Sequence, residues 1–152
     1  MSIDKFDKEI LRRLQKDGKK QNKDLADEIG LSQSPCSRRV KHLEDTNIIR
    51  EYVALVEPAA VGFPISIYAN VALDKQTKES VKHFEDAIMN YPEVMECYLV
   101  TGKYDYILRI VAQSIDSYQT FLMDKLTLIE GVKNIQTTIT MKPVKYSTSI
   151  PL

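Results

Sequence analysis

The sequence has few of the residues on which most metalloproteins and redox proteins depend. It contains two cysteines and two histidines in 152 residues. Cys36 and Cys97 lie far apart and fit no metal or redox spacing, so we expect two buried, reduced thiols. Neither His42 nor His83 has a Cys, Asp or Glu partner at metal-ligand spacing. There is no P-loop, no Gly-x-Ser-x-Gly and no dinucleotide fingerprint. We therefore expect no metal, no cofactor and no enzyme activity.

Long apolar runs are absent as well. No run approaches the roughly 20 residues of a membrane span, and the opening MSIDKFDKEI has no apolar signal-peptide centre. Hydrophobic residues still make up 43% of the chain, which is enough for real cores. We expect a soluble, cytoplasmic protein without a membrane partner, built as one large domain or two small ones.

An excess of either charge sign is also missing. The 21 Lys and Arg residues balance 21 Asp and Glu residues, and residues 1–60 alone carry 12 basic against 11 acidic residues. Any affinity for nucleic acid must therefore come from local placement of charge. One segment stands out: residues 31–45, LSQSPCSRRVKHLED, bring Arg38, Arg39 and Lys41 close together.

The first 45 residues are predicted to form three short helices. Residues 4–18 place apolar side chains on one helix face and stop at Gly18. Residues 22–30 follow, with Asn22 as the cap and Gly30 as the end. Short helices joined by a Gly-containing turn indicate a helix-turn-helix. The inward residues of the first two helices are Phe6, Ile10, Leu11, Leu14, Leu25 and Ile29.

The third helix has a buried face and a basic face. Ser32 or Ser34 can cap it, and Pro35 is tolerated in its first turn. Three apolar residues spaced by four and three share the inward face. A recognition helix enters the major groove with its N-terminal residues leading, where Arg and Lys can donate to guanine. The inward residues are Cys36, Val40 and Leu43, and those predicted to contact DNA are Gln33, Ser34, Pro35, Ser37, Arg38, Arg39, Lys41 and His42. The alternative is a solvated basic face on an ordinary helix.

The segment IIREYVALVEP, residues 48–58, is predicted to form one or two strands, a small wing and a connector. Pro58, Gly62 and Pro64 cluster directly after it, and we place the domain boundary there. Residues 1–60 then form a DNA-binding domain with its connecting strand, and residues 61–152 form a second domain.

The second domain shows the order strand, helix, strand, strand, helix, strand. This βαββαβ order is typical of a ferredoxin-like fold, which hosts many functions. The chain is therefore predicted to be α+β, a winged helix-turn-helix followed by a ferredoxin-like domain. The second helix is expected from Ser114 to Gly131, and the last strand is expected to place Ile135, Thr137, Ile139 and Met141 on one face. Two helices cover one sheet face, so the other needs a partner, for which a second sheet is the natural candidate.

The hairpin turn TGKYDY, residues 101–106, holds the second group of polar candidates. Gly102 is ordinary in a turn that needs positive φ. Asp105 in a strand is less ordinary: it is either a charge that protects a sheet edge or part of a binding site. Spacing alone does not separate these two interpretations.

Four segments make the chain similar to one family. DKxDKxILxxLQxDG, NxxLAxxIGLSxSPCxRRVKxLE, IxxYxALVxP and TGxYDYxLRI resemble the Lrp/AsnC, or feast/famine, regulators of bacteria and archaea. The resemblance covers nearly the whole chain. It implies a winged helix-turn-helix that binds double-stranded DNA and a ferredoxin-like domain that dimerises and binds amino acids. It also implies that the dimers assemble further, commonly into octamers.

The resemblance also places an effector pocket at the 101–106 turn. It implies that Thr101, Gly102 and Asp105 contact a small amino acid, whereas Tyr104 and Tyr106 either line the site or pack. Thr137 and Thr138 are candidates for the opposite wall. Three functions stay open: a DNA-binding regulator that senses an amino acid, a ligand-independent architectural DNA-binding protein, and a regulatory subunit of an amino-acid enzyme.

Overall fold

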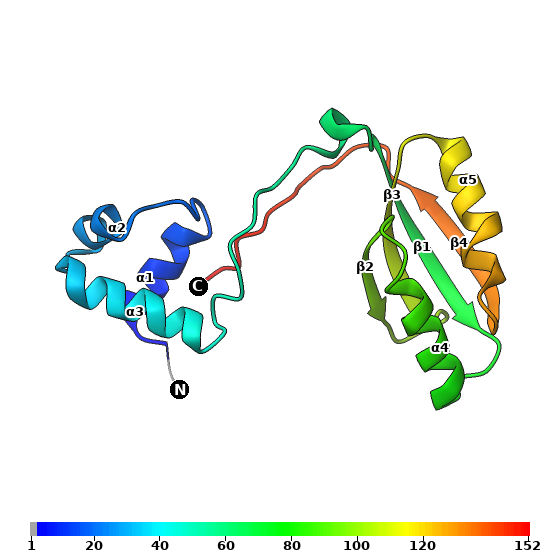
Figure 1. Cartoon of the computed structure of the whole chain (residues 1–152), viewed down its shortest axis with the longest axis horizontal. Coiled ribbons are helices and arrows are strands. Elements are labelled where there is room, and N and C mark those ends of the chain that lie inside the picture. Colours follow the sequence, from blue (N-terminus) through cyan, green and yellow to red (C-terminus); the bar gives the residue numbers. More distant parts are fainter. Residues whose placement is uncertain (1–2) are drawn as a thin grey trace. The chain divides into compact units, whose positions relative to one another are not determined.

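The computed structural model describes residues 3–152, which form two compact units (Figure 1). The first comprises residues up to Leu55 together with the C-terminal segment Val144–Leu152, and the second comprises Val56–Pro143. The structure divides the chain after Leu55, a few residues before the boundary predicted between residues 60 and 61. The prediction also kept the C-terminal segment in the second domain. The chain therefore passes between the units twice.

The first unit contains three helices, α1 (Lys5–Leu14), α2 (Asn22–Ile29) and α3 (Gln33–Asp45). α1 begins at a reciprocal capping box, in which the side chains of Asp4 and Asp7 each accept the backbone N–H of the other residue. These two bonds satisfy N–H groups that a first helical turn leaves free. The helix ends at Leu14, before the predicted stop at Gly18.

One apolar core joins the three helices. The inward face predicted for α3 is confirmed, because Cys36, Val40 and Leu43 are all buried. Phe6, predicted to point inward, is exposed instead. Burial of a valine, leucine or isoleucine side chain typically stabilises a fold by about 1.5–3 kcal/mol. The shared core therefore holds the three short helices together. The other buried members are Ile10, Leu11, Leu14, Leu25 and Ala26.

The turn between α2 and α3 depends on a glycine. Gly30 ends α2 in the left-handed region, at φ 71°, and donates its N–H to the carbonyl of Ala26. The predicted cap at Asn22 is wrong: Gln21 holds the capping position, Asn22 is the first helical residue, and no side chain caps the helix. Ser32 does precede α3 as expected, but its side chain makes no capping bond.

Gly30→Ala should lower the free energy of unfolding by roughly 1 kcal/mol, because a Cβ is strained at this φ. Nothing lies within 4 Å of the added Cβ, so the loss is one of backbone conformation alone. Gly30→Asn is the matched control and should lose less, since Asn visits this region more readily. Chemical denaturation measures both variants. Equal losses for Ala and Asn would contradict the backbone explanation.

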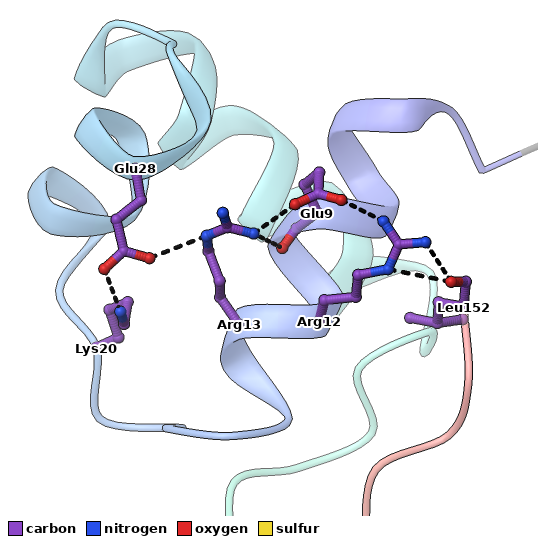
Figure 2. A network of polar contacts seen from close by, with 6 residues as sticks. All are labelled: Glu9, Arg12, Arg13, Lys20, Glu28 and Leu152. Carbon is purple, nitrogen blue, oxygen red and sulfur yellow. Dashed lines mark hydrogen bonds and ion pairs between the residues drawn. The ribbon is translucent and has the colours of Figure 1, made fainter.

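A polar network ties α1 to its neighbours in the first unit (Figure 2). Arg13 lies between Glu9 and Glu28, with its Nε 2.9 Å from a Glu28 oxygen on α2. Arg12 pairs with Glu9 and also donates to the carbonyl of Leu152, with Nε 3.0 Å from that oxygen. Exposed ion pairs contribute about 0–1 kcal/mol each. The network therefore orients α1 and the C-terminal segment more than it stabilises them.

Residues 50–57 form no strand, so the one or two strands predicted for residues 48–58 are wrong. Alternating apolar residues suit a strand, but a strand also needs a backbone partner, and none pairs with this segment among residues 3–152. The chain runs extended and then enters a short 3₁₀ turn, Pro58–Val61, which ends at Gly62. Tyr52 anchors the segment to the first unit by donating its hydroxyl to Glu44 at 2.8 Å.

The second unit has the predicted ferredoxin-like order. The strands lie as β2-β3-β1-β4, and every neighbouring pair is antiparallel. Both helices pack on one face of this sheet, as Figure 1 shows. The elements are β1 (Ile65–Leu73), α4 (Lys78–Ile88), β2 (Val94–Leu99), β3 (Tyr106–Ala112), α5 (Ile115–Asp124), a 3₁₀ turn (Leu126–Leu128) and β4 (Val132–Ile139).

Strict alternation along the central strands separates the two faces of the sheet. In β3 each second residue from Tyr106 to Ala112 is buried, and the intervening Ile107, Arg109 and Val111 are only partly covered. The buried set packs against Phe84 of α4 and Phe121 of α5. The opposite face is therefore left without a covering layer in a single chain.

Two predicted ends differ from the structure. α5 stops at Asp124 rather than near Gly131, because Lys125 leaves helical geometry and allows Leu126 to enter the core. The last strand ends at Ile139, so Met141, predicted to share its face, is fully exposed beyond it.

Candidate DNA-binding helix and effector pocket

The outer surface of α3 carries the basic residues singled out by the sequence. Arg38 and Lys41 are exposed, as are Gln33, Ser34 and His42, whereas Pro35 and Ser37 are half-buried. The buried stripe of Cys36, Val40 and Leu43 fixes which surface faces outward. Polar side chains and N–H groups at the start of an exposed helix suit phosphate oxygens and base edges.

Arg39, which was also predicted to contact DNA, forms ion pairs within the first unit. Its Nη1 lies 2.7 Å from a carboxylate oxygen of Asp4 and 2.8 Å from one of Asp7. Its guanidinium carbon also lies 5.5 Å from the centre of the Phe6 ring. The side chain therefore bridges α3 to the start of α1.

The 101–106 turn forms a pocket in the second unit. The N–H of Val100 donates to the carbonyl of Asp105 at 2.8 Å, and the N–H of Asp105 donates to the carbonyl of Val71 at 2.9 Å. These bonds close the turn against the end of β1. The open pocket of about 560 Å³ is lined by Leu73, Gln76, Val81, Leu99, Val100, Thr101, Gly102, Tyr104 and Asp105.

Asp105 is fixed by two donors from the β1 end. One carboxylate oxygen accepts the N–H of Leu73 at 2.7 Å, and the other accepts the side-chain amide of Gln76. Leu73 sits at an irregularity in the pairing of β1 with β4. An ionised carboxylate offers about four acceptor positions, so Asp105 retains capacity for a further donor.

The structure does not bring the remaining predicted effector residues to this pocket. Tyr106 is buried, its ring lies 4.5 Å from that of Phe84, and its hydroxyl donates to Glu85 at 3.0 Å. Burial raises the pKa of Tyr106. Thr137 instead exchanges a hydrogen bond with Tyr118 at 2.6 Å. Thr138 also lies on β4, outside the lining.

Each of the two units matches a known protein family. Residues 3–50 match the winged helix-turn-helix DNA-binding family, and residues 66–150 match the Lrp/AsnC ligand binding domain. The Bkd operon transcriptional regulator of Pseudomonas aeruginosa is 38% identical over 99% of this chain and 98% of its own. The chain belongs to the Lrp/AsnC family.

Other members of the Lrp/AsnC family are similar over their full length. The leucine-responsive regulatory protein of Rhizobium meliloti is 35% identical over 100% of this chain and 97% of its own. A transcriptional regulator from Neisseria meningitidis, solved as a complex with L-methionine, superposes with a TM-score of 0.95 at 34% identity, covering 99% of this chain and 97% of that one.

Family membership confirms the predicted α+β fold and the predicted function of a DNA-binding transcriptional regulator. The family is one of transcriptional regulators. No helix within residues 3–152 is long and apolar enough to cross a membrane.

Sequence reasoning about this Lrp/AsnC protein missed the three pocket residues that come from outside residues 99–105: Leu73, Gln76 and Val81. The available signal was topological. In the antiparallel β1–β3 pair Val71 lies opposite Tyr106, so the residues after β1 have to lie beside the turn before β3. The TGKYDY motif indicates Asp105 but carries no information about the end of β1, which lies beside it.

Proposed function

We propose that this regulator binds double-stranded DNA through the outer surface of α3 and that a small, apolar amino acid in the Asp105 pocket changes that binding. The observation that carries the proposal is the pocket itself. A carboxylate, backbone N–H groups and apolar walls lie together in the ligand-binding domain. The methionine complex of the Neisseria relative supports an amino-acid ligand.

The pocket has a complementary group for each part of an amino acid. The ammonium needs an acceptor, which Asp105 supplies, and the carboxylate needs donors. The N–H groups of Thr101 and Gly102 have no hydrogen-bond partner among residues 3–152, and Gly102 adopts φ 118°. A turn of this kind lets a ligand approach the backbone closely. Leu73, Val81 and Leu99 offer apolar surface to the side chain.

A second candidate function is DNA binding without sensing. It is favoured by the two hydrogen bonds that Asp105 already accepts from Leu73 and Gln76, which suit a purely structural carboxylate. This candidate predicts no effect of amino acids on DNA binding.

A gel-shift assay separates the two candidates. The probe is DNA from upstream of the protein's own gene, titrated with and without each of the 20 amino acids. Amino-acid sensing predicts that a small apolar amino acid shifts the midpoint by about 5–150-fold, the usual range of coupling between two sites. An unchanged midpoint with every amino acid leaves the ligand-independent function. Absence of any shifted band would refute DNA binding at this probe.

We also propose that the uncovered sheet face is a self-association surface, giving a homodimer that assembles into an octamer as the family resemblance implies. Tyr68, Tyr98, Ile107 and Val111 lie on this face by strand register, beside an ion pair between Arg109 and Glu96. Aromatic and aliphatic side chains of this kind suit packing against a second sheet.

Ile107→Asp should convert the assembly to smaller species, because it buries a carboxylate without a partner at the sheet-to-sheet contact. Sedimentation of the full chain at micromolar concentration should give at least a dimer for the wild type. Met89→Asp is the control, since Met89 lies at the end of α4 and is exposed. A monomeric wild type would rule out the proposed assembly.

A further inference from the structure

Arg39 is the basic residue of α3 that the structure commits to another helix. It contacts Asp4 and Asp7 at 2.7 and 2.8 Å, and both carboxylates lie at the first turn of α1. The side chain of Asp7 is 13% exposed and that of Arg39 is 33% exposed, so water screens this pair only in part.

Every carboxylate oxygen at this site has a partner. One oxygen of Asp4 accepts the N–H of Asp7 at 2.9 Å, and one oxygen of Asp7 accepts the N–H of Asp4 at 3.2 Å. The two remaining oxygens face the same guanidinium nitrogen of Arg39. Arg39 therefore neutralises two like charges that the capping box brings together, and the cap in turn holds Arg39.

The two carboxylates and the Phe6 ring all favour the charged guanidinium of Arg39 at this position. Hydrogen bonds from the Asp7 N–H and from Arg39 hold the pKa of Asp4 below its usual value. Hydrogen bonds to Asp7 and Asp4 raise the pKa of Arg39. The Phe6 ring lies within cation–π range of the guanidinium. Three groups from one turn of α1 thus fix the direction of one side chain of α3.

A lock of this kind matters for a helix that reads DNA. The buried stripe of α3 decides which surface faces outward, but its apolar contacts are not directional and do not specify the exact rotation of the helix. Arg39 lies outside that stripe and next to Arg38, so its bonds to α1 restrict that rotation. Base recognition depends on hydrogen bonds whose geometry tolerates little error.

We infer that Arg39 is a positioning residue, which sets the rotation of α3 through the Asp4–Asp7 cap, and that it is not itself a DNA contact. The inference rests on the proposed function, in which α3 binds DNA. It assigns the same consequence, weaker DNA binding, to Asp7→Asn and Arg39→Gln, two substitutions for which electrostatics alone predicts opposite effects.

Asp7→Asn is the discriminating variant. It removes a negative charge from the DNA-binding domain, so simple attraction to phosphate predicts tighter binding. Loss of positioning predicts weaker binding. The probe is a duplex selected by the wild-type protein from a random pool, with a shuffled duplex as the non-specific reference, and the affinity is measured over a range of salt.

We expect Asp7→Asn and Arg39→Gln each to weaken binding to the selected duplex about tenfold, which corresponds to roughly one well-made base contact. The slope of affinity against salt should stay unchanged in both. The double variant should lose no more than Arg39→Gln alone, because the bond that Asp7→Asn weakens is one that Arg39→Gln also removes. Arg39→Lys should recover only part of the affinity, since an ammonium cannot reproduce the planar fork.

Tighter binding by Asp7→Asn, or a slope reduced by about one unit in Arg39→Gln, would overturn the inference and make Arg39 a phosphate contact. Thermal unfolding of the wild type, Asp7→Asn, Arg39→Gln and the double variant needs no DNA. A non-additive loss of melting temperature in the double variant supports the lock, and additive losses contradict it. If the wild type does not prefer the selected duplex, specific DNA binding by α3 fails, and the unfolding cycle still decides whether the lock exists.

Discussion

Asp105→Asn should abolish the response of DNA binding to an amino acid while leaving ligand-free DNA binding nearly unchanged. Asparagine keeps an oxygen that can accept the Leu73 N–H, so the turn is preserved. It removes the charge that an ammonium requires. The loss of a charge-assisted hydrogen bond of this kind costs about 1.5–3 kcal/mol, which weakens ligand affinity about 10–150-fold.

The control is Asp74, a carboxylate next to the pocket residue Leu73 in the sequence but outside the pocket lining. Asp74 lies one residue beyond β1, is exposed, and pairs with Lys133 at 3.8 Å. Asp74→Asn changes the net charge by the same amount and should leave the response intact. Calorimetry with L-methionine and L-leucine on both variants measures the affinity directly. Equal affinity in wild type and Asp105→Asn would make the carboxylate structural and place the ligand elsewhere.

A ligand in this pocket can act on DNA binding only through a difference in its affinity for two states of the protein. Asp105 offers a local source of such a difference. An ammonium that approaches the oxygen now bonded to Gln76 competes with that amide. Ligand binding is therefore expected to change the contacts of the loop between β1 and α4.

The local sequence pattern was sufficient to predict an element and its buried face where a single apolar stripe determines both. The spacing of Cys36, Val40 and Leu43 predicted the buried face of α3, and burial confirms it. The order of elements after residue 64 predicted the antiparallel sheet. Both depend on hydrophobic burial, which repeats with the period of the element and can be read from one segment at a time.

Prediction failed where the partner of a residue lies far along the chain. Tyr106 is different, because its place could have been predicted locally. It belongs to the buried set of β3, and strand alternation alone is enough to exclude it from the pocket. Nothing local shows that Gln76 reaches Asp105, or that Arg39 reaches the α1 cap, because these contacts depend on how elements pack. Residues 50–57 have the pattern of a strand, but a pattern does not supply the second strand.

Arg38→Ala should weaken specific DNA binding by about 1–3 kcal/mol, or about 5–150-fold, if its guanidinium reads a base edge. Arg38 is exposed on the first half of α3 and forms no salt bridge among residues 3–152, so its guanidinium is free to contact DNA. The loss should appear against the preferred sequence and be small against a shuffled duplex. Discrimination at one base position should relax with it.

Lys41→Ala provides the contrast on the same helix surface. Lys41 lies three residues further along, also exposed, and an ammonium contributes to phosphate as a point charge. Its removal should weaken binding to both duplexes alike and reduce the salt slope by roughly one unit. Arg38 and Lys41 thus predict different patterns, one dependent on sequence and one dependent on salt, although each variant loses one positive charge. Unchanged affinity in both variants, with the helical circular dichroism intact, would remove α3 from the DNA interface.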